Sequence, residues 1–334
     1  MPSSTSSSDV RWLHAKWGLT WAMTAVIVLL SLCAWETFWR IKGYRPAISD
    51  DVRLWISARQ SVKPDSVVLV GSSRMHADVH PSYFKEVAGM APTQLAVNGG
   101  MSYLVLEQLA HDVTFKGTVI CDLMEVEIAT GMTTVWERGV INSYKQRTLA
   151  ERSDGFLQRL VQKKLALALP QLSLPALAAD VVKRQWPAIT PHYQISEDRA
   201  LLVDFSRLDV AKLRNYITSV TVDQGPQITP AEFIARTRRF EVLAEEIERR
   251  GGRVIFVKMP ITGILWDRLE KAYPKASYWD EFARQTHFAT IHFRDYPELQ
   301  IECADYSHLD MRDAPRFTRA LAKILLEKGL IKPE

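Results

Sequence analysis

The sequence predicts an α/β protein whose mainly parallel sheet carries helices on both faces, with a transmembrane helix at its N-terminus. Two observations predict it. From Ser66 onward, short apolar runs bounded by glycine, proline or polar residues alternate with helical segments. Strands that alternate with helices form parallel sheets covered on both faces. One long uncharged segment precedes this region. The 334 residues suffice for one large domain or two small ones.

The N-terminal apolar segment, Trp17 to Trp39, predicts the transmembrane helix. No residue from Leu19 to Ala34 is charged. With its aromatic flanks the segment reaches about 20 residues, enough to cross a bilayer as a helix. Tryptophan at both ends suits the two membrane interfaces. A cleaved signal peptide is the alternative, but no small-x-small site follows the run. We therefore expect an uncleaved anchor.

The anchor divides the chain into parts of different character. We expect residues 1–16 to form a disordered cytoplasmic tail and residues 40–64 a juxtamembrane connector with an amphipathic helix over Asp51–Gln60. Residues 65–334 form the main domain. Basic residues flank the anchor on both sides, so the positive-inside rule alone does not fix its orientation. The long domain that follows favours a short cytoplasmic tail and an exported domain.

Within residues 65–334 the strand candidates are short apolar runs, and the helix candidates lie between them. The strand candidates are Val67–Val70, Thr93–Val97, Thr118–Cys121, Arg253–Lys258 and Thr290–Phe293. The helix candidates are Tyr103–Asp112, Pro230–Arg250, Tyr278–Gln285 and Asp313–Lys328. The helix from Pro230 has the clearest start, because Thr229 is a suitable N-cap and proline is favoured at the first helical position.

Residues 131–229 interrupt the alternation. They contain a basic amphipathic helix over Leu157–Leu169, and several prolines follow. We expect one helical insertion between strands of the sheet, rather than a separate domain. A lid, a substrate wall, a surface against the membrane and a cap without a direct role all remain open as its role.

Composition excludes several classes of function. The net charge of +4 is spread along the chain without a dense basic stripe, which argues against nucleic-acid binding. Three widely spaced cysteines do not form a disulfide or metal framework. Asp122, Glu125 and Glu127 are a candidate carboxylate cluster, but they lack histidine or cysteine partners at ligand spacing. We expect neither a metal nor a cofactor.

Polar residues converge at the carboxyl ends of the predicted strands, where the active sites of α/β sheets lie. In strand order they are Gly71-Ser72-Ser73-Arg74, then Asn98-Gly99-Gly100, then Asp122 with Glu125, and finally Asp305-Tyr306-Ser307-His308. A serine hydroxyl becomes a strong nucleophile when an imidazole removes its proton. A carboxylate can fix the tautomer of that imidazole. The sequence thus offers the three groups of nucleophilic acyl chemistry.

These motifs resemble the SGNH (GDSL-like) hydrolase superfamily, over about residues 65–129 and 230–328. More narrowly, the chain is similar to the membrane-anchored branch of envelope acylation, with the alginate acetylation proteins and the D-alanyl transfer protein of teichoic acid synthesis. Gly71-Ser72-Ser73-Arg74 stands where the family has Gly-Asp-Ser-Leu. The resemblance implies Ser73 as the nucleophile and puts the competing Ser72 at the aspartate position. It also implies His308 as the base and Asp305 as its orienting acid.

Asn98-Gly99-Gly100 is similar to the family's glycine block, which implies that the N–H groups of Gly100 and Ser73 face the oxyanion. The family's Gly-x-Asn-Asp block is missing, because residues 121–125 contain no asparagine. Either Asn98 substitutes for it or two donors suffice. Arg74 is expected to contact an anionic substrate or to form a salt bridge, and His76 to be a surface or packing residue.

The resemblance implies a three-layer, flavodoxin-like SGNH sandwich on a single-pass protein of the bacterial inner membrane, exposed to the periplasm or extracytoplasmic space. It implies an O-acyltransferase, with acetyl as the expected group, or an esterase that acts on an envelope or secreted polysaccharide. The expected partners are the polysaccharide acceptor, an acyl donor, the membrane and a multi-pass membrane acyltransferase. The rival interpretation is a non-catalytic assembly protein that uses an SGNH-like fold to bind polysaccharide or to dock on an acyl-export partner.

Overall fold

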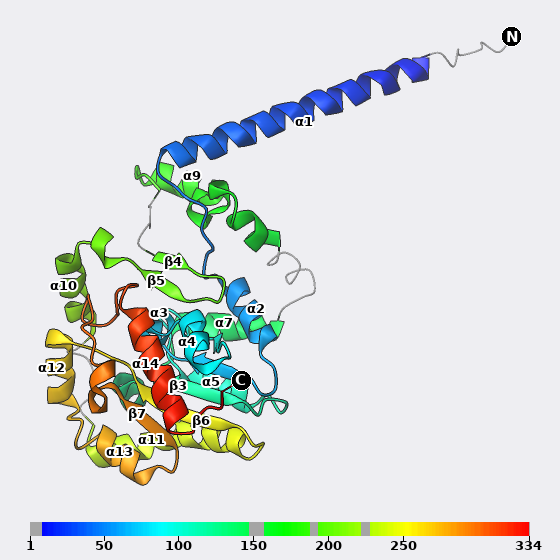
Figure 1. The fold of residues 1–334 in the computed structure, drawn as a ribbon. Coiled ribbons are helices and arrows are strands. Elements are labelled where there is room, and N and C mark those ends of the chain that lie inside the picture. Colours follow the sequence, from blue (N-terminus) through cyan, green and yellow to red (C-terminus); the bar gives the residue numbers. More distant parts are fainter. Residues whose placement is uncertain (1–8, 147–156, 188–192, 222–227, 334) are drawn as a thin grey trace. The chain divides into compact units, whose positions relative to one another are not determined.

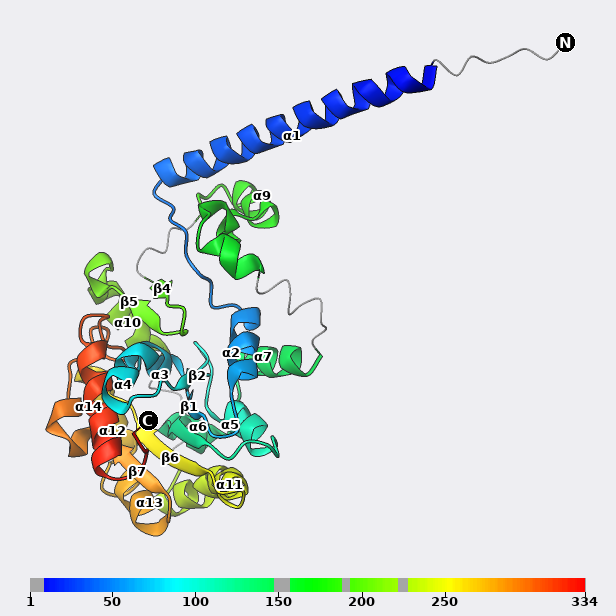
Figure 2. The same ribbon diagram turned by 45° about the vertical axis from the view of Figure 1, so that its right-hand side comes forward.

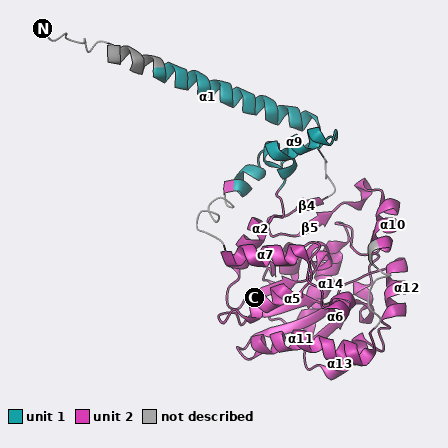
Figure 3. Cartoon of the chain, turned by 180° about the vertical axis from the view of Figure 1, so that it is seen from behind, with its two compact units in different colours: residues 1–47, 158–189 teal, residues 48–157, 190–334 magenta. Residues whose placement is uncertain are grey.

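The computed structural model describes residues 9–146, 157–187, 193–221 and 228–333. The chain forms two compact units (Figure 3). The smaller unit joins residues 1–47 to residues 158–189, and the larger unit contains residues 48–157 and 190–334. The expected insertion is therefore divided, because its middle part belongs with the N-terminal helix and its ends belong with the sheet.

The sheet of the larger unit is parallel throughout (Figures 1 and 2). Its five strands lie in the order β2-β1-β3-β6-β7. They are β1 (Val67–Val70), β2 (Thr93–Gln94), β3 (Thr118–Asp122), β6 (Arg253–Lys258) and β7 (Ala289–His292). This is a doubly wound order, in which the winding reverses between β1 and β3. Ligands of such sheets bind beyond the carboxyl ends of the strands at this point. The predicted α/β class with a mainly parallel sheet is confirmed.

Helices cover both faces because successive strand residues point to opposite sides. Val68 and Val70 of β1 belong to one apolar core, and Val67 and Leu69 belong to the other. The first core contains residues of α2 (Val52–Ser61), α5 (Tyr103–Ala110), α6 (Glu125–Thr130), α7 (Val135–Gln146), α11 (Pro230–Glu248) and α13 (Trp279–Gln285). The second contains residues of α3 (Ser73–Asp78), α4 (Pro81–Ala88), α12 (Gly263–Ala272) and α14 (Ala314–Glu327).

The sequence analysis expected a helical insertion, but the end of the insertion also contains strands. It contains an antiparallel hairpin of β4 (Tyr193–Ile195) and β5 (Leu201–Val203), followed by the 3-10 turn η3 (Phe205–Arg207) and α10 (Val210–Thr221). Strands of three residues are too short to show an alternating pattern in the sequence. Leu201, Val203 and Phe205 form a small apolar cluster with Ala77 of α3.

In the smaller unit, α1 (Asp9–Ile41) contains an apolar stretch, Trp17–Ile41, that is long enough to cross a membrane. The helix begins at Asp9, so residues 9–16 extend it and are not part of a disordered tail. Residues 1–8 lie outside the described part of the chain. The structure therefore agrees with a single N-terminal apolar helix and moves its start toward the N-terminus.

The helix predicted over Leu157–Leu169 ends much earlier, at residue 162. Beyond it lie η1 (Ala166–Ala168), η2 (Pro170–Leu172) and α9 (Leu174–Val182). The Glu36 carboxylate accepts hydrogen bonds of 2.9 Å from the N–H groups of Ala166 and Leu167. Arg40 donates to the carbonyl of Lys164 at 2.7 Å. Because α1 engages these backbone groups, they are not used to continue the helix.

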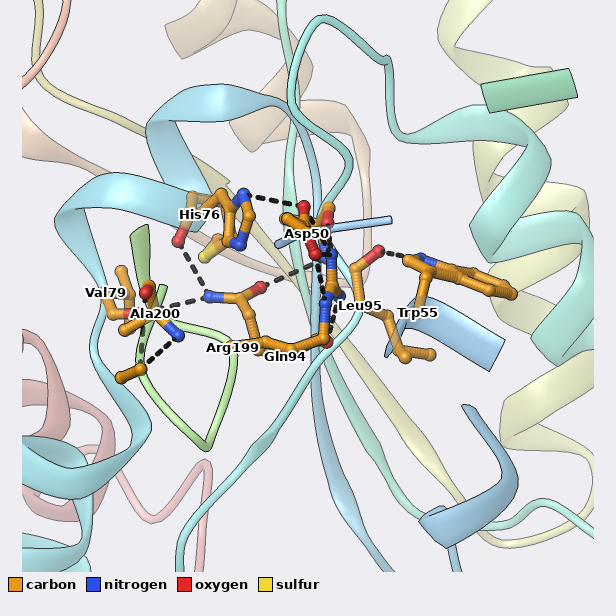
Figure 4. Close-up of polar contacts among 11 residues, drawn as sticks. Asp50, Trp55, His76, Val79, Gln94, Leu95, Arg199 and Ala200 are labelled. Carbon is orange, nitrogen blue, oxygen red and sulfur yellow. Dashed lines mark hydrogen bonds and ion pairs between the residues drawn. The ribbon is translucent and has the colours of Figure 1, made fainter. Parts of the chain in front are cut away.

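An ion pair between the buried Arg199 and the partly exposed Asp50 lies at the outer edge of the sheet beside β2 (Figure 4). The Arg199 guanidinium donates to both carboxylate oxygens of Asp50, at 2.8 and 3.0 Å. It also donates to the carbonyls of Gln94 and Ala96, at 2.6 and 3.2 Å. Arg199 has φ of 61°, a left-handed conformation that the tip of the hairpin requires. The predicted strand Thr93–Val97 is paired as a strand only over Thr93–Gln94. The segment beyond it still lies against β1, because the N–H groups of Leu95 and Val97 donate to the carbonyls of Leu69 and Gly71.

His76 lies beside this ion pair and is fully buried (Figure 4). Its Nδ1 lies 3.8 Å from Asp50 Oδ2, and neither ring nitrogen has a hydrogen-bond partner among the described residues. Burial lowers the pKa of His76 to about 4, although the negative charge of Asp50 opposes the shift. Of the two expectations for His76, the structure selects packing.

We predict that Arg199→Met lowers the free energy of unfolding by about 3 kcal/mol, because it leaves Asp50 and two carbonyls without a donor. The matched control is Arg207→Met, which removes an exposed pair with Asp204. We expect a much smaller loss there, because water screens an exposed pair. Denaturant unfolding of the full chain in detergent measures both losses. Equal losses in the two variants would contradict the role of the pair between Arg199 and Asp50.

We predict that His76 makes the protein less stable as pH falls from about 6.5 to 4. In this window the unfolded chain binds a proton at His76 and the folded chain does not, so acid favours unfolding. His76→Phe removes this linkage. The stability difference between wild type and variant should shift by about 3 kcal/mol across the window. Parallel stability–pH curves for the two proteins would show that the imidazole is not held neutral.

Candidate active site

The turn after β1 presents Ser73 as the first residue of α3. Gly71 is required there, because a Cβ at this position would lie 2.6 Å from Asp122 Cβ. The Ser72 hydroxyl donates to Asp122 Oδ2 at 2.9 Å and accepts from the Arg74 N–H at 3.3 Å. Ser72 therefore acts as the N-cap of α3 and is bound to the neighbouring strand, which leaves Ser73 as the serine that faces the imidazole.

The loop before α14 folds around the Asp305 carboxylate. Its Oδ1 accepts from the N–H groups of Ser307 and His308, at 2.9 and 2.7 Å. Tyr306 has φ of 75°, which bulky residues rarely adopt. Strained backbone of this kind persists where the surrounding structure holds it, often at functional sites. Here the tight turn brings the carboxylate and the imidazole of the same loop together.

Ser73, His308 and Asp305 form one continuous chain of hydrogen bonds. Ser73 Oγ lies 2.8 Å from His308 Nε2, and His308 Nδ1 lies 2.8 Å from Asp305 Oδ2. Because the Asp305 carboxylate can only accept a hydrogen bond, Nδ1 of the neutral ring carries the hydrogen. Nε2 is then the nitrogen that accepts from the Ser73 hydroxyl. The serine and the histidine are 235 positions apart in the sequence. This is the geometry that base-assisted attack by a serine needs.

Electrostatics favour charge separation within this chain. Burial by itself lowers the pKa of His308, but the charge of the Asp305 carboxylate and its hydrogen bond raise it overall above the ordinary value of 6.5. Burial also raises the pKa of Asp305, but His308 and two backbone N–H groups outweigh it and lower the pKa overall. Asp305 is thus held as an anion that stabilises a protonated imidazole.

Asp78 is a further acid near the imidazole that the sequence analysis missed. It is the last residue of α3 and fully buried. Its Oδ1 accepts from the Leu309 N–H at 2.9 Å, and its Oδ2 has no hydrogen-bond partner among the described residues. Burial raises the pKa of Asp78 to about 8. Asp78 therefore joins the helix of Ser73 to the residue after His308. The sequence signal that could have identified Asp78 is its position as an acid between apolar residues, Ala77 and Val79.

Two further sets of contacts hold the His308 loop. Arg74, which is half-buried, donates from Nε to Ser307 Oγ at 3.1 Å. From the insertion, the carbonyl of Val203 accepts from the Met311 N–H at 2.9 Å, and Arg214 donates to the Ala304 carbonyl at 2.8 Å. The end of the insertion is therefore a brace for the candidate site and not a remote cap.

The turn formed by Asn98, Gly99 and Gly100 follows a segment that lies beside Gly71, because the Val97 N–H donates to the Gly71 carbonyl at 3.0 Å. Asn98 and Gly99 are exposed. The N–H of Gly100 already donates to the Val97 carbonyl at 2.9 Å, so this conformation does not offer it to an oxyanion. That expectation is corrected. A Cβ at Gly100 would lie 2.7 Å from Val97 Cβ, so the tight turn itself requires the glycine.

The sequence analysis considered Asp122, Glu125 and Glu127 as a carboxylate cluster. In the structure these acids bind different partners. Glu125 pairs with the buried ammonium of Lys258 at the end of β6. Glu127 accepts from the N–H groups of Ser102 and Tyr103, at 3.0 and 2.7 Å. Burial raises the pKa of Glu127 to about 8. No group of three potential metal-ligating side chains occurs within the described ranges.

Comparison with known proteins found no matching family model, no matching curated protein and no matching solved structure. The fold and the site therefore define the class by themselves. The chain is an α/β protein with a mainly parallel sheet and one N-terminal apolar helix, and a serine, a histidine and an aspartate are hydrogen-bonded in series at the carboxyl edge of the sheet.

We predict that the pKa of His308 lies above 6.5 and that Asp305→Asn lowers it, because the substitution removes the adjacent negative charge. Proton-detected NMR titration of histidine-labelled full chain in detergent measures both values. His308→Gln identifies the resonance by removing it. A His308 pKa that stays unchanged in Asp305→Asn would contradict the electrostatic coupling.

Proposed function

We propose that the protein is a membrane-anchored serine acyl-ester enzyme of the SGNH type, either an O-acyltransferase or an esterase. The observation that carries the proposal is the hydrogen-bonded series Ser73–His308–Asp305. Its location also supports the proposal, because β1 ends at the switch point of a doubly wound sheet, where ligand sites lie.

In the first half-reaction, Ser73 Oγ attacks the ester carbonyl while His308 Nε2 takes the hydroxyl proton. The tetrahedral intermediate collapses, and His308 returns this proton to the leaving alcohol. An acyl group remains on Ser73. In the second half-reaction, water or a sugar hydroxyl loses a proton to His308 and attacks the acyl carbonyl. The second tetrahedral intermediate collapses, and His308 returns the proton to the departing Ser73 Oγ. The products are the free serine and either an acid or a new ester.

The developing oxyanion needs fixed donors near Ser73. The Ser73 N–H is one candidate, because it donates to no acceptor among the described residues and stands at the start of α3. Asn98 is a second candidate, because its exposed side chain follows the segment that pairs with Gly71. Because the Gly100 N–H is occupied, the N–H groups of Ser73 and Gly100 do not form a two-donor oxyanion hole in this conformation. We therefore prefer the alternative in which Asn98 substitutes for the missing asparagine block.

The resemblance supports an envelope or secreted polysaccharide as the acceptor and acetyl as the group. The apolar helix within α1 supports anchoring. We propose a periplasmic location for the larger unit from the resemblance. A tether keeps the site near a membrane-bound acyl donor, such as a multi-pass acyltransferase partner. Tethering therefore favours transfer over hydrolysis.

We predict that the full chain releases nitrophenol from a short-chain nitrophenyl ester. Ser73→Ala and His308→Ala should each reduce kcat/KM by about a thousandfold or more, and their losses should not add. Asp305→Asn should cost less. The rate should rise with pH through the raised pKa of His308, because only the neutral imidazole accepts a proton.

The matched control is Ser72→Ala, which should retain substantial activity because Ser72 caps α3 and bonds to Asp122. Each variant must keep its Tm within a few degrees of wild type. Full activity in Ser73→Ala refutes the nucleophile. If wild type is inactive on the ester and cells with stably expressed Ser73→Ala still acylate their polymer, the non-catalytic assembly protein is the correct interpretation.

A further inference from the structure

Helix α9 turns an apolar face outward. Leu174, Ala178, Val181 and Val182 follow the spacing i, i+4, i+7 and i+8, which places them on one side of the helix. None of the α9 residues is buried, and Val181 and Val182 are 76% and 83% exposed. Soluble proteins direct such a face to their core. A large exposed apolar face typically marks a surface that binds a protein, a membrane or a ligand.

Direct contacts attach the segment of α9 to the end of α1, within the same unit (Figure 3). Glu36 accepts from the N–H groups of Ala166 and Leu167, both at 2.9 Å. The Tyr44 hydroxyl donates to the carbonyl of Pro187, at 2.6 Å. Trp39 and Tyr44 form a small apolar core in this unit, and Leu177 of α9 packs against it. These contacts fix α9 at the level where the apolar stretch Trp17–Ile41 ends.

Aromatic and basic side chains surround the same end of α1. Trp186 is exposed, and the Lys42 ammonium lies 5.8 Å from its ring and 5.7 Å from that of Phe38. Lys183 and Arg184 follow α9 directly and are exposed. Tryptophan is enriched at the headgroup level of membranes, and lysine and arginine are attracted to anionic lipids.

We propose that α9 lies in the membrane interface, with Leu174, Val181 and Val182 at the boundary between headgroups and acyl chains. Trp186 and the basic pair Lys183 and Arg184 lie at the headgroups. The inference rests on the proposed anchoring by α1. The occupant is a lipid surface, because α9 is fixed to the end of the apolar helix and its flanking charges complement anionic lipid. Residues 158–187 thus act as a second, interfacial contact beside the spanning helix.

The test uses the full chain with Cys33→Ala and one new cysteine, Val182→Cys, labelled with an environment-sensitive fluorophore. Cys121 and Cys303 are buried and do not compete for the label. In vesicles of phosphatidylcholine and phosphatidylglycerol we expect a blue-shifted emission that quenchers at shallow acyl positions reduce. The matched control is Val113→Cys, because Val113 is an equally exposed valine of the larger unit, at 79%. The label at this position should show the emission of a fluorophore in water.

An aqueous emission from Val182→Cys in these vesicles overturns the proposal. Protection that appears only in native membranes and not in pure lipid assigns the face to a protein partner and overturns it as well. Lys183→Glu with Arg184→Glu should abolish the additional blue shift that anionic lipid causes. Alkaline carbonate extraction distinguishes a failure of the proposed anchoring from a failure of the interfacial role of α9. Extraction of the chain refutes the anchoring itself, whereas a retained chain with an aqueous label refutes only the interfacial role of α9.

Discussion

The hydrogen bond between Ser73 and His308 depends on how firmly two short segments are held at the same edge of the sheet. One segment is the turn into α3, which Gly71 allows to pack against Asp122. The other is the loop that folds around the Asp305 carboxylate. Because a serine and an imidazole react only within hydrogen-bond reach, small shifts of either segment would disconnect them. The contacts that join the segments therefore matter as much as the three residues themselves.

Those contacts are polar, and Asp78 makes one of them from a fully buried position. Asp78 ties α3 to Leu309, and Arg74 ties it to Ser307. Buried polar groups are costly unless they are paired, so each of them specifies one arrangement of its neighbours. Arg199 and Asp50 act in the same way at the outer edge, where they join the connector and the hairpin to the sheet. The insertion is thus part of the framework of the site.

The two units differ in what covers their apolar surface. In the larger unit, helices cover both faces of the sheet and the strands are buried. In the smaller unit, α1 and α9 leave apolar side chains exposed, and only a small core around Trp39 lies between them. The proposed contact of both helices with lipid would cover these exposed side chains, because an apolar surface is stable in an apolar environment.

The sequence by itself determined the local elements whose signals are contiguous. Val67–Val70 and Arg253–Lys258 form strands with the predicted bounds, and Thr229 caps α11 as expected, because runs and caps need only neighbouring residues. It also nominated Ser73, Asp305 and His308. Only the tertiary structure decided that the Gly100 N–H is occupied, that Asp78 lies against the His308 loop, and that Glu36 ends the helix of residues 157–162. The Asp78 and Glu36 contacts join residues that are distant in the chain, and local sequence patterns carry no information about such pairs. The Gly100 contact is local, but the direction of an N–H group in a turn depends on dihedral angles that the surrounding packing fixes.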